Sequence, residues 1–418
     1  MNELKTPRGM KDITPNEAHE WRLLRNIVEE AMDKMNYGFI TTPIVEKAEI
    51  FNRTIGEESD ILSKEMYIFK DKGNTELALR PEGTASVCRA YIEHNMTSLA
   101  QPVRLAYIGP MFRYDRPQAG RYRQLWQFGA ECIGVNSPEI DTELIFLQNY
   151  IFNNLQIEGY ILKINSLGGI ETRKIFEKDL KIFLSKQKNN LSEDSKKRFN
   201  TNALRIFDSK NKNDQEILKN APSILSYLSK KEEIHFNKVT ELLKILNINY
   251  SIDPSIVRGL DYYTDTVWEF EPKNETSQST IGAGGRYNNL IKLLGGKDIP
   301  GAGFASGIER SLNLSNKVKI NNNNKLDIYI IPLSEQASAY CFRIIDILVK
   351  QKYSFVTGNY NNSIKSQLRS ANNANAKLSF IIGDNEIKDS SITIKFLLDN
   401  KEDVSIPIKN LYEKLSSL

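Results

Sequence analysis

The chain has 418 residues, too many for one ordinary hydrophobic core, so we expect two or three domains. Hydrophobic residues make up 40% and charged residues 26%, a composition typical of a soluble globular protein. The net charge of +4 is small, which excludes attraction to a polyanion through overall charge and leaves only local basic patches for that purpose.

Cysteine and histidine are too few and too scattered for a zinc site. The cysteines are Cys88, Cys132 and Cys341, and there are three histidines. We therefore assign no metal ligands. An odd number of scattered cysteines suits a reducing compartment, and the polar start MNELKTPRGMKD lacks the apolar stretch of a signal peptide. These features predict a cytoplasmic protein.

The first predicted element is an amphipathic helix over Pro15–Met35. Apolar residues recur at helical spacing from Trp21 to Met35, and Gly38 follows as a stop signal. Such a stripe is the pattern of a core helix.

Residues 102–134 predict a β-hairpin with a long loop. The first strand runs to Arg113, the loop covers Tyr114–Gln124, and the second strand continues through Cys132. The two-residue period of a strand divides the second strand into Leu125, Gln127, Gly129 and Glu131 on one face and Trp126, Phe128, Ala130 and Cys132 on the other. We expect one face to join the core and the other to line a solvated site.

The composition changes between about Leu167 and Asn249. Lysine, asparagine and glutamate rise, glycine nearly disappears, and helical spacing dominates, which predicts an inserted helical module. Its lysines are explained either as contacts to nucleic-acid phosphates or as an ordinary solvated face.

A polar run at Asn321–Asn324 predicts a linker. The segment after it alternates between strand and helix, which predicts a small α/β domain. The expected elements are strand 326–332, helix 335–350, a short strand near Phe355, helix 363–374, strands 378–382 and 392–398, and a final helix.

Several segments together identify a family. The hairpin Pro102–Gly134 resembles motif 2 of the class II aminoacyl-tRNA synthetases, in its bacterial-type histidyl version. The other matching segments are Pro7–Asp12 (the opening), Tyr37–Phe39 leading to Pro43 (the dimer-forming motif 1), Arg80–Thr84 (the amino-group-binding loop), Arg258–Tyr263 (a segment specific to histidyl enzymes), Gly282–Tyr287 (the histidine-pocket lining) and Gly301–Leu312 (motif 3). The resemblance runs through essentially the whole chain.

The resemblance implies an α+β fold with a largely antiparallel catalytic sheet, a helical insertion and a small anticodon-binding domain. The expected bounds are 1–166 and 250–320 for the two parts of the catalytic domain, 167–249 for the insertion, 321–325 for the linker and 326–418 for the anticodon-binding domain.

Amino-acid activation joins two anions, since a carboxylate attacks the α-phosphate of ATP and pyrophosphate leaves. Such a reaction needs fixed cations more than a general base, and arginine provides a permanent charge and a planar fork for phosphate. The resemblance assigns catalysis to Arg113 and Arg258, and ATP binding to Arg113, Arg121, Arg123 and Arg310.

The resemblance also assigns the histidine pocket. Its residues are Glu82, Gly83, Thr84, Arg113, Gln127, Glu131, Arg258, Tyr262 and Tyr263. We expect Glu131 and Tyr263 to recognise the two imidazole nitrogens, and Gly129 to leave room for the ligand. One departure is Leu125, because histidyl enzymes commonly place phenylalanine under the adenine ring at this position.

The implied partners are L-histidine, tRNA(His), ATP with its Mg²⁺ and a second copy of the chain, with no membrane. The implied reaction forms histidyl-adenylate, transfers histidine to tRNA, and releases AMP and pyrophosphate. The alternative is a catalytically inactive relative that regulates or senses, because such proteins share the fold.

Two other nucleotide sites are rejected. GAGFASG has the spacing GxGxxxG instead of the GxGxxG of a dinucleotide site, and Gly295-Gly296-Lys297 is followed by Asp298 instead of the Ser or Thr of a P-loop.

Overall fold

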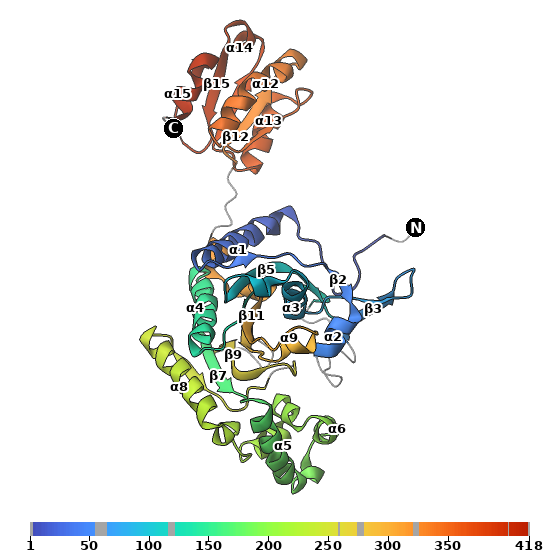
Figure 1. Cartoon of the computed structure of the whole chain (residues 1–418). Helices are drawn as coiled ribbons and strands as arrows, with labels where there is room; N and C mark the ends of the chain where they lie inside the picture. Colours follow the sequence, from blue (N-terminus) through green and yellow to red (C-terminus); the bar gives the residue numbers. More distant parts are fainter. Residues whose placement is uncertain are drawn as a thin grey trace. The chain divides into compact units, whose positions relative to one another are not determined.

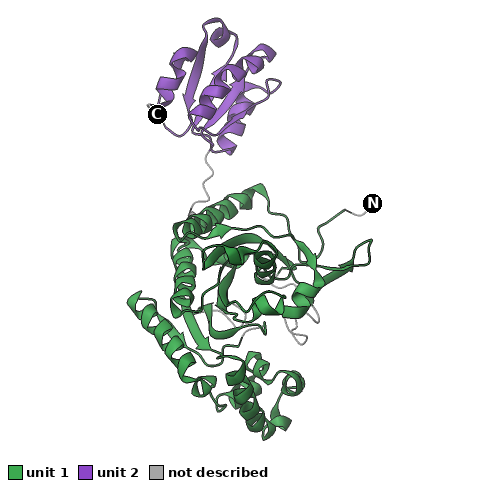
Figure 2. Cartoon of the chain, in the orientation of Figure 1, with its two compact units in different colours: residues 1–320 green, residues 321–418 purple. Residues whose placement is uncertain are grey.

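The computed structural model describes residues 3–54, 65–115, 122–257, 260–273, 280–320, 326–399 and 401–416. Its contacts divide the chain into two compact units, residues 1–320 and 321–418 (Figure 2). The predicted linker 321–325 lies outside the described residues.

Unit 1 is built on an eight-stranded sheet in the order β1-β5-β6-β11-β10-β9-β7-β8 (Figure 1). Its strands are β1 (Gly38–Phe39), β5 (Val103–Phe112), β6 (Gln124–Ile133), β7 (Tyr160–Ser166), β8 (Tyr250–Ile252), β9 (Thr264–Pro272), β10 (Gly282–Arg286) and β11 (Gly301–Gly307). The six central strands are mutually antiparallel, and β1 and β8 add a parallel pairing at each edge. The predicted largely antiparallel sheet is confirmed.

The predicted hairpin is also confirmed, as β5 and β6. Phe128, Ala130 and Cys132 of β6 are buried in one hydrophobic cluster with residues of α1 (Pro15–Lys34) and α4 (Pro138–Asn154). Leu125 and Gln127 lie on the opposite face and line a cavity. The two-residue period therefore separates core from site as expected.

Helix α1 occupies nearly the whole of its predicted range. Pro15 opens it, and Glu17 accepts a hydrogen bond from the Thr14 backbone N–H at 3.3 Å, which caps the first turn. Its buried stripe packs against α4, so it is the core helix that its spacing indicated. The remaining elements of unit 1 before the insertion are β2 (Val45–Lys47), α2 (Ala48–Thr54), β3 (Tyr67–Lys70), β4 (Glu76–Leu79), α3 (Thr84–Glu93) and η2 (Met96–Ser98).

Residues 170–245 contain only helical elements in the part that the structure describes. These are α5 (Ile170–Ser185), η3 (Lys188–Asn190), α6 (Glu193–Thr201), η4 (Ala203–Asp208), α7 (Lys212–Leu218), η5 (Ile224–Tyr227) and α8 (Lys230–Ile245). Helix α8 packs along α4 and shares its hydrophobic cluster, whereas α5 joins a second cluster (Figure 1). The predicted bounds of the insertion stay a prediction, because the contacts divide the chain only after residue 320.

Unit 1 ends in α9 (Leu290–Leu293), α10 (Ile308–Leu314) and α11 (Asn316–Ile320). Unit 2 has its own core under a five-stranded sheet in the order β13-β12-β14-β15-β16. Its elements are β12 (Ile328–Pro332), α12 (Glu335–Lys350), β13 (Phe355–Thr357), α13 (Ile364–Asn373), β14 (Leu378–Ile382), α14 (Asp384–Lys388), β15 (Ser391–Phe396), β16 (Val404–Pro407), η6 (Ile408–Asn410) and α15 (Leu411–Ser416). The predicted α/β alternation is confirmed, and β16 and α14 are additions to it.

No helix among the described residues is long and apolar enough to cross a membrane.

Candidate active site

A cavity of about 520 Å³ in unit 1 collects predicted residues from distant parts of the sequence. It is bounded by β6, β9, β10, β11, α10, the start of α3 and the segment before β9. The predicted site residues that line it are Glu82, Thr84, Arg113, Gln127, Tyr262, Tyr263 and Arg310. Gly282 and Ala283 of the glycine-rich segment also line it.

Other predicted residues do not line this cavity. Gly83 and Glu131 lie behind its wall, and the guanidinium of Arg123 lies 3.7 Å from the centre of the Tyr114 ring. Arg121 and Arg258 lie outside the described residues. Their roles stay predictions.

Arg113 and Arg310 are oriented by backbone carbonyls. The Arg113 Nε donates to the Pro81 oxygen at 2.8 Å, and an Arg310 Nη1 donates to the Thr280 oxygen at 2.6 Å. A guanidinium is planar and permanently charged, so a hydrogen bond to a backbone carbonyl helps to set the direction in which its fork points. Both side chains then bring fixed positive charge to the cavity.

The Glu82 carboxylate faces the cavity and also caps helix α3. It accepts hydrogen bonds from the backbone N–H groups of Thr84 at 2.6 Å and Ala85 at 2.8 Å. Burial raises the pKa of Glu82, while these two N–H groups and the charge of Arg113 oppose the rise. The cap therefore fixes one acidic group at the cavity wall.

Glu131 is fully buried between two hydroxyl groups. Thr84 Oγ1 donates to its Oε1 at 2.7 Å, and the Tyr287 hydroxyl donates to its Oε2 at 2.5 Å. Burial raises the pKa of Glu131 to about 8, although both hydroxyls favour the ionised form. Thr84 lines the cavity, so a single side chain links Glu131 to it.

Glycines beside Glu131 make room for other protein groups. Gly303 pairs with Glu131 across β11 and β6, and a Cβ at Gly303 would lie 1.7 Å from Glu131 Oε2. The expectation that Gly129 leaves room for the ligand is wrong, because a Cβ there would meet the Tyr107 ring at 2.5 Å. Gly83 also borders the Tyr107 ring, at the same distance. Tyr107 therefore fills the space that these two glycines leave.

Gln127 and Leu125 are the two β6 side chains at the cavity. In the described part of the chain, Gln127 Oε1 is buried without a hydrogen-bond partner, which suits a donor from a ligand. Leu125 lines the same cavity, whereas Trp126 points to the other face and packs edge-on against Trp21 with ring centres 5.7 Å apart.

Several residues of the site had no individual role in the sequence prediction. Tyr287, at the end of the segment expected to line the histidine pocket, holds Glu131, and Glu309 lines the cavity while accepting the Trp126 backbone N–H at 3.0 Å. Asp208 and Lys210, which belong to the helical insertion, line the cavity too. Tyr287 and Glu309 stand inside matched motifs, which was a usable signal. Asp208 and Lys210 lie in a polar segment with no such signal.

The described lining is rich in charge of both signs. Its carboxylates are Glu65, Glu82, Asp115, Asp208, Glu269 and Glu309, and its cations are Arg113, Lys210 and Arg310. Among the described residues, no three histidine, cysteine or acidic side chains are grouped so as to hold a metal ion.

Comparison with known proteins decides the family. A family model described as histidyl-tRNA synthetase matches residues 9–310, and an anticodon-binding-domain model matches residues 327–418. The chain belongs to the histidyl-tRNA synthetase family.

Histidyl-tRNA synthetase relatives match along the whole chain. A histidine–tRNA ligase of Halothermothrix orenii is 42% identical over 418 residues and covers 100% of both chains, and one of Streptococcus mutans is 42% identical over 94% of this chain and 92% of its own. The solved structure of apo S. aureus histidyl-tRNA synthetase has a TM-score of 0.82 and 34% identity, and the match covers 99% of this chain and 100% of that one.

Proposed function

We propose that this chain is a histidine–tRNA ligase, which forms histidyl-adenylate from L-histidine and ATP and then transfers histidine to tRNA(His). The supporting observation is the cavity in which arginines from motifs 2 and 3 meet the tyrosines of the histidine-specific segment. Full-length identity to histidine–tRNA ligases supports the same reaction.

In the activation step, the histidine carboxylate attacks the α-phosphate of ATP and pyrophosphate leaves. Arg113 neutralises the attacking carboxylate and the α-phosphate, and Arg310 binds the terminal phosphates and packs on adenine. The family resemblance assigns Arg258 to the α-phosphate as well, and this residue lies outside the described part of the chain. ATP brings its Mg²⁺, which in such sites is held by phosphates and one or two carboxylates, and the acidic lining can supply these.

The ammonium and imidazole groups of histidine are bound by different residues of the wall. The ammonium donates to Glu82 and to the unpartnered Oε1 of Gln127. The imidazole contacts Tyr263, and Glu131 receives a ring N–H once the Thr84 hydroxyl turns toward the substrate. A side chain without these ring donors leaves buried polar groups unpaired, which costs about 1–3 kcal/mol for each.

Two further partners follow from the two units. The C-terminal unit, which matches the anticodon-binding model, binds the tRNA(His) anticodon region. Two copies of the chain associate through motif 1 as a homodimer. Phe39, Ile44 and Val45, in and near strand β1, are each more than two-fifths exposed, which supports an interface there.

The decisive experiment is exchange of labelled pyrophosphate into ATP with each of the twenty amino acids. Histidine alone should support exchange, because only its ring matches the buried acid and phenol. No exchange with histidine would favour the catalytically inactive alternative. That alternative is disfavoured here because Arg113, Gln127, Glu131 and Arg310 are all present, together with a C-terminal unit that matches the anticodon-binding model.

A further inference from the structure

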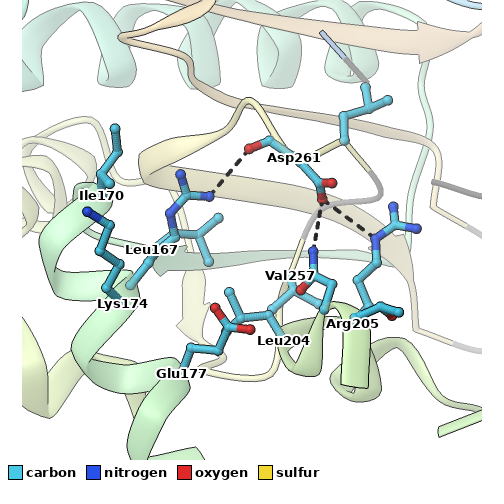
Figure 3. Close-up of a pocket in the computed structure, with 12 residues that line it drawn as sticks. Leu167, Ile170, Lys174, Glu177, Leu204, Arg205, Val257 and Asp261 are labelled. Atoms are coloured by element: carbon cyan, nitrogen blue, oxygen red, sulfur yellow. Dashed lines mark hydrogen bonds and ion pairs between the residues drawn. The ribbon is translucent and has the colours of Figure 1, made fainter. Parts of the chain in front are cut away.

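A second cavity, of about 380 Å³, lies between the helical insertion and the histidine-specific segment (Figure 3). It is lined by α5 and by residues at the junction of α6 and η4 on one side, and by Val257, Leu260 and Asp261 on the other. Val257 and Leu260 also line the candidate active site. These two side chains therefore form a wall between two cavities. Each of them borders open space on both of its sides.

Asp261 is the polar contact that ties this wall to the insertion. Its Oδ1 accepts a hydrogen bond from Asn202 Nδ2 at 3.3 Å and lies 3.7 Å from Arg205 Nε, as the dashed lines in Figure 3 show. Its backbone oxygen accepts a hydrogen bond from Arg173 Nη1 at 3.4 Å. Arg205 is buried and the Asp261 side chain is 33% exposed, so solvent reaches this ion pair from the Asp261 side only.

On the insertion side, polar contacts join helices α5, α8 and α4 to one another. Glu232 of α8 accepts from the Thr172 hydroxyl of α5 at 2.7 Å, and His235 of the same helix pairs with the buried Asp141 of α4 at 2.7 Å. The groups that hold Asp261 are thus linked to the helices that cover the main sheet.

The same insertion segment also reaches the active site. Asn202 immediately precedes η4 and Arg205 lies within it, whereas Asp208 at its end and Lys210 just beyond it line the candidate active site. The segment therefore contacts the histidine-specific segment at one end and the substrate cavity at the other.

We propose that Asn202 and Arg205 are positioning residues, which act through Asp261 to hold the histidine-specific segment in its productive place. The proposal rests on the proposed ligase function. Asp261 immediately precedes Tyr262 and Tyr263, and consecutive Cα atoms are about 3.8 Å apart, so a shift of Asp261 moves the tyrosines of the histidine pocket. Arg258 lies three residues before Asp261 on the same short segment.

The test uses Asn202→Ala, Arg205→Ala and Asp261→Asn in the full-length protein. Each should lower kcat of histidine-dependent pyrophosphate exchange about 10- to 100-fold, because small misplacement of reacting groups carries penalties of this size. KM for histidine should rise, whereas KM for ATP should stay within about twofold because Arg113 and Arg310 are untouched. Arg205→Lys keeps the charge and should recover part of the lost rate.

The double variant Arg205→Ala/Asp261→Asn should be no slower than Arg205→Ala alone, because both changes remove the same ion pair. Lys174→Ala is the matched control. Lys174 lines the same second cavity and pairs with Glu171, and the parent rate is expected. Circular dichroism and tryptophan fluorescence report folding, and if Arg205→Ala fails to fold, Asn202→Ala and Asp261→Asn decide the question.

Calorimetric titration with L-histidine, which needs no turnover, separates this inference from the proposed function. A parent chain that neither exchanges pyrophosphate with histidine nor binds it overturns both. A parent that exchanges normally, with variants that match it in kcat, in both KM values and in histidine affinity, overturns the positioning role alone. Additive losses in the double variant would also overturn it.

Discussion

A buried carboxylate flanked by two hydroxyls is the central feature of this site at the level of single residues. Glu131 has no exposed surface, yet both of its oxygens are satisfied, by Thr84 and by Tyr287. The arrangement keeps a titratable acid next to the substrate cavity without leaving an unpaired polar atom in the core.

The raised pKa of Glu131, about 8 against an ordinary value of about 4.5, predicts a pH dependence of stability. Between these values the folded state binds more protons than the unfolded state, so the free energy of unfolding falls as pH rises. Glu131→Gln should remove up to about 1.4 kcal/mol per pH unit of this slope.

Urea unfolding at several pH values between 5 and 8 measures the Glu131 effect. Tryptophan fluorescence is a suitable signal, because Trp21, Trp126 and Trp268 all lie in unit 1. An unchanged slope in the variant would mean that Glu131 is already ionised in the folded protein across this range.

Leu125→Phe tests the place of the adenine ring. Because Leu125 lines the cavity, an aromatic ring there should stack on adenine and contribute about 0.5–1.5 kcal/mol. KM for ATP in pyrophosphate exchange should fall about 2- to 10-fold, while KM for histidine stays the same. If KM for ATP did not fall, adenine would have to bind elsewhere.

Where strand period or a family motif applied, the sequence predicted residues that line the cavity. Gln127 and Leu125 face the cavity because alternation along β6 dictates it, and Arg113 follows from the end of β5. Gly129 was misjudged because its neighbour Tyr107 comes from another strand, and a side chain's rotamer cannot be read from its own sequence. Asp208 and Lys210 were missed for a similar reason, since only tertiary packing brings the insertion to the cavity.

At the level of elements, strand β1 is where the chain exposes apolar surface beside the main sheet. It stands at one edge of the described eight-stranded sheet and pairs only with β5 there. Phe39 is 44% exposed on this two-residue strand. Exposed apolar side chains on a sheet edge favour association with another chain.

Phe39→Glu should therefore weaken the proposed homodimer. A charge placed in an apolar interface loses hydration without gaining a partner, so we expect the dimer dissociation constant to rise at least about 10-fold. Sedimentation velocity over a dilution series measures this, and Ile68→Glu on β3, another exposed apolar position, tests whether the effect is specific to motif 1. A parent that sediments as a monomer at all concentrations would remove the homodimer from the proposal.

Elements with strong local signals were predicted nearly to the residue, and weak ones were not. Helix α12 and strand β14 have the bounds expected from their spacing, and α1 ends one residue early. Strand β16 has four residues and helix α14 five, so neither carries a period long enough to recognise.

At the level of the whole molecule, the two units have separate cores. The hydrophobic cluster of unit 2 draws all its residues from 328–415, and those of unit 1 end at Val318. A chain ending at residue 320 should therefore keep histidine-dependent pyrophosphate exchange, within about 10-fold of the parent, while losing most charging of tRNA(His). Loss of exchange together with a parental fluorescence spectrum would show that adenylate formation needs unit 2.

The contact between Gly303 and Glu131 has a consequence for how the enzyme can change over time. A single methyl group at position 303 would occupy the place of a carboxylate oxygen, although Gly303 itself donates no side chain to any ligand. Mutational scanning should therefore find position 303 as intolerant as the acid it borders. A larger residue at 303 would therefore need a compensating change at position 131 on the neighbouring strand.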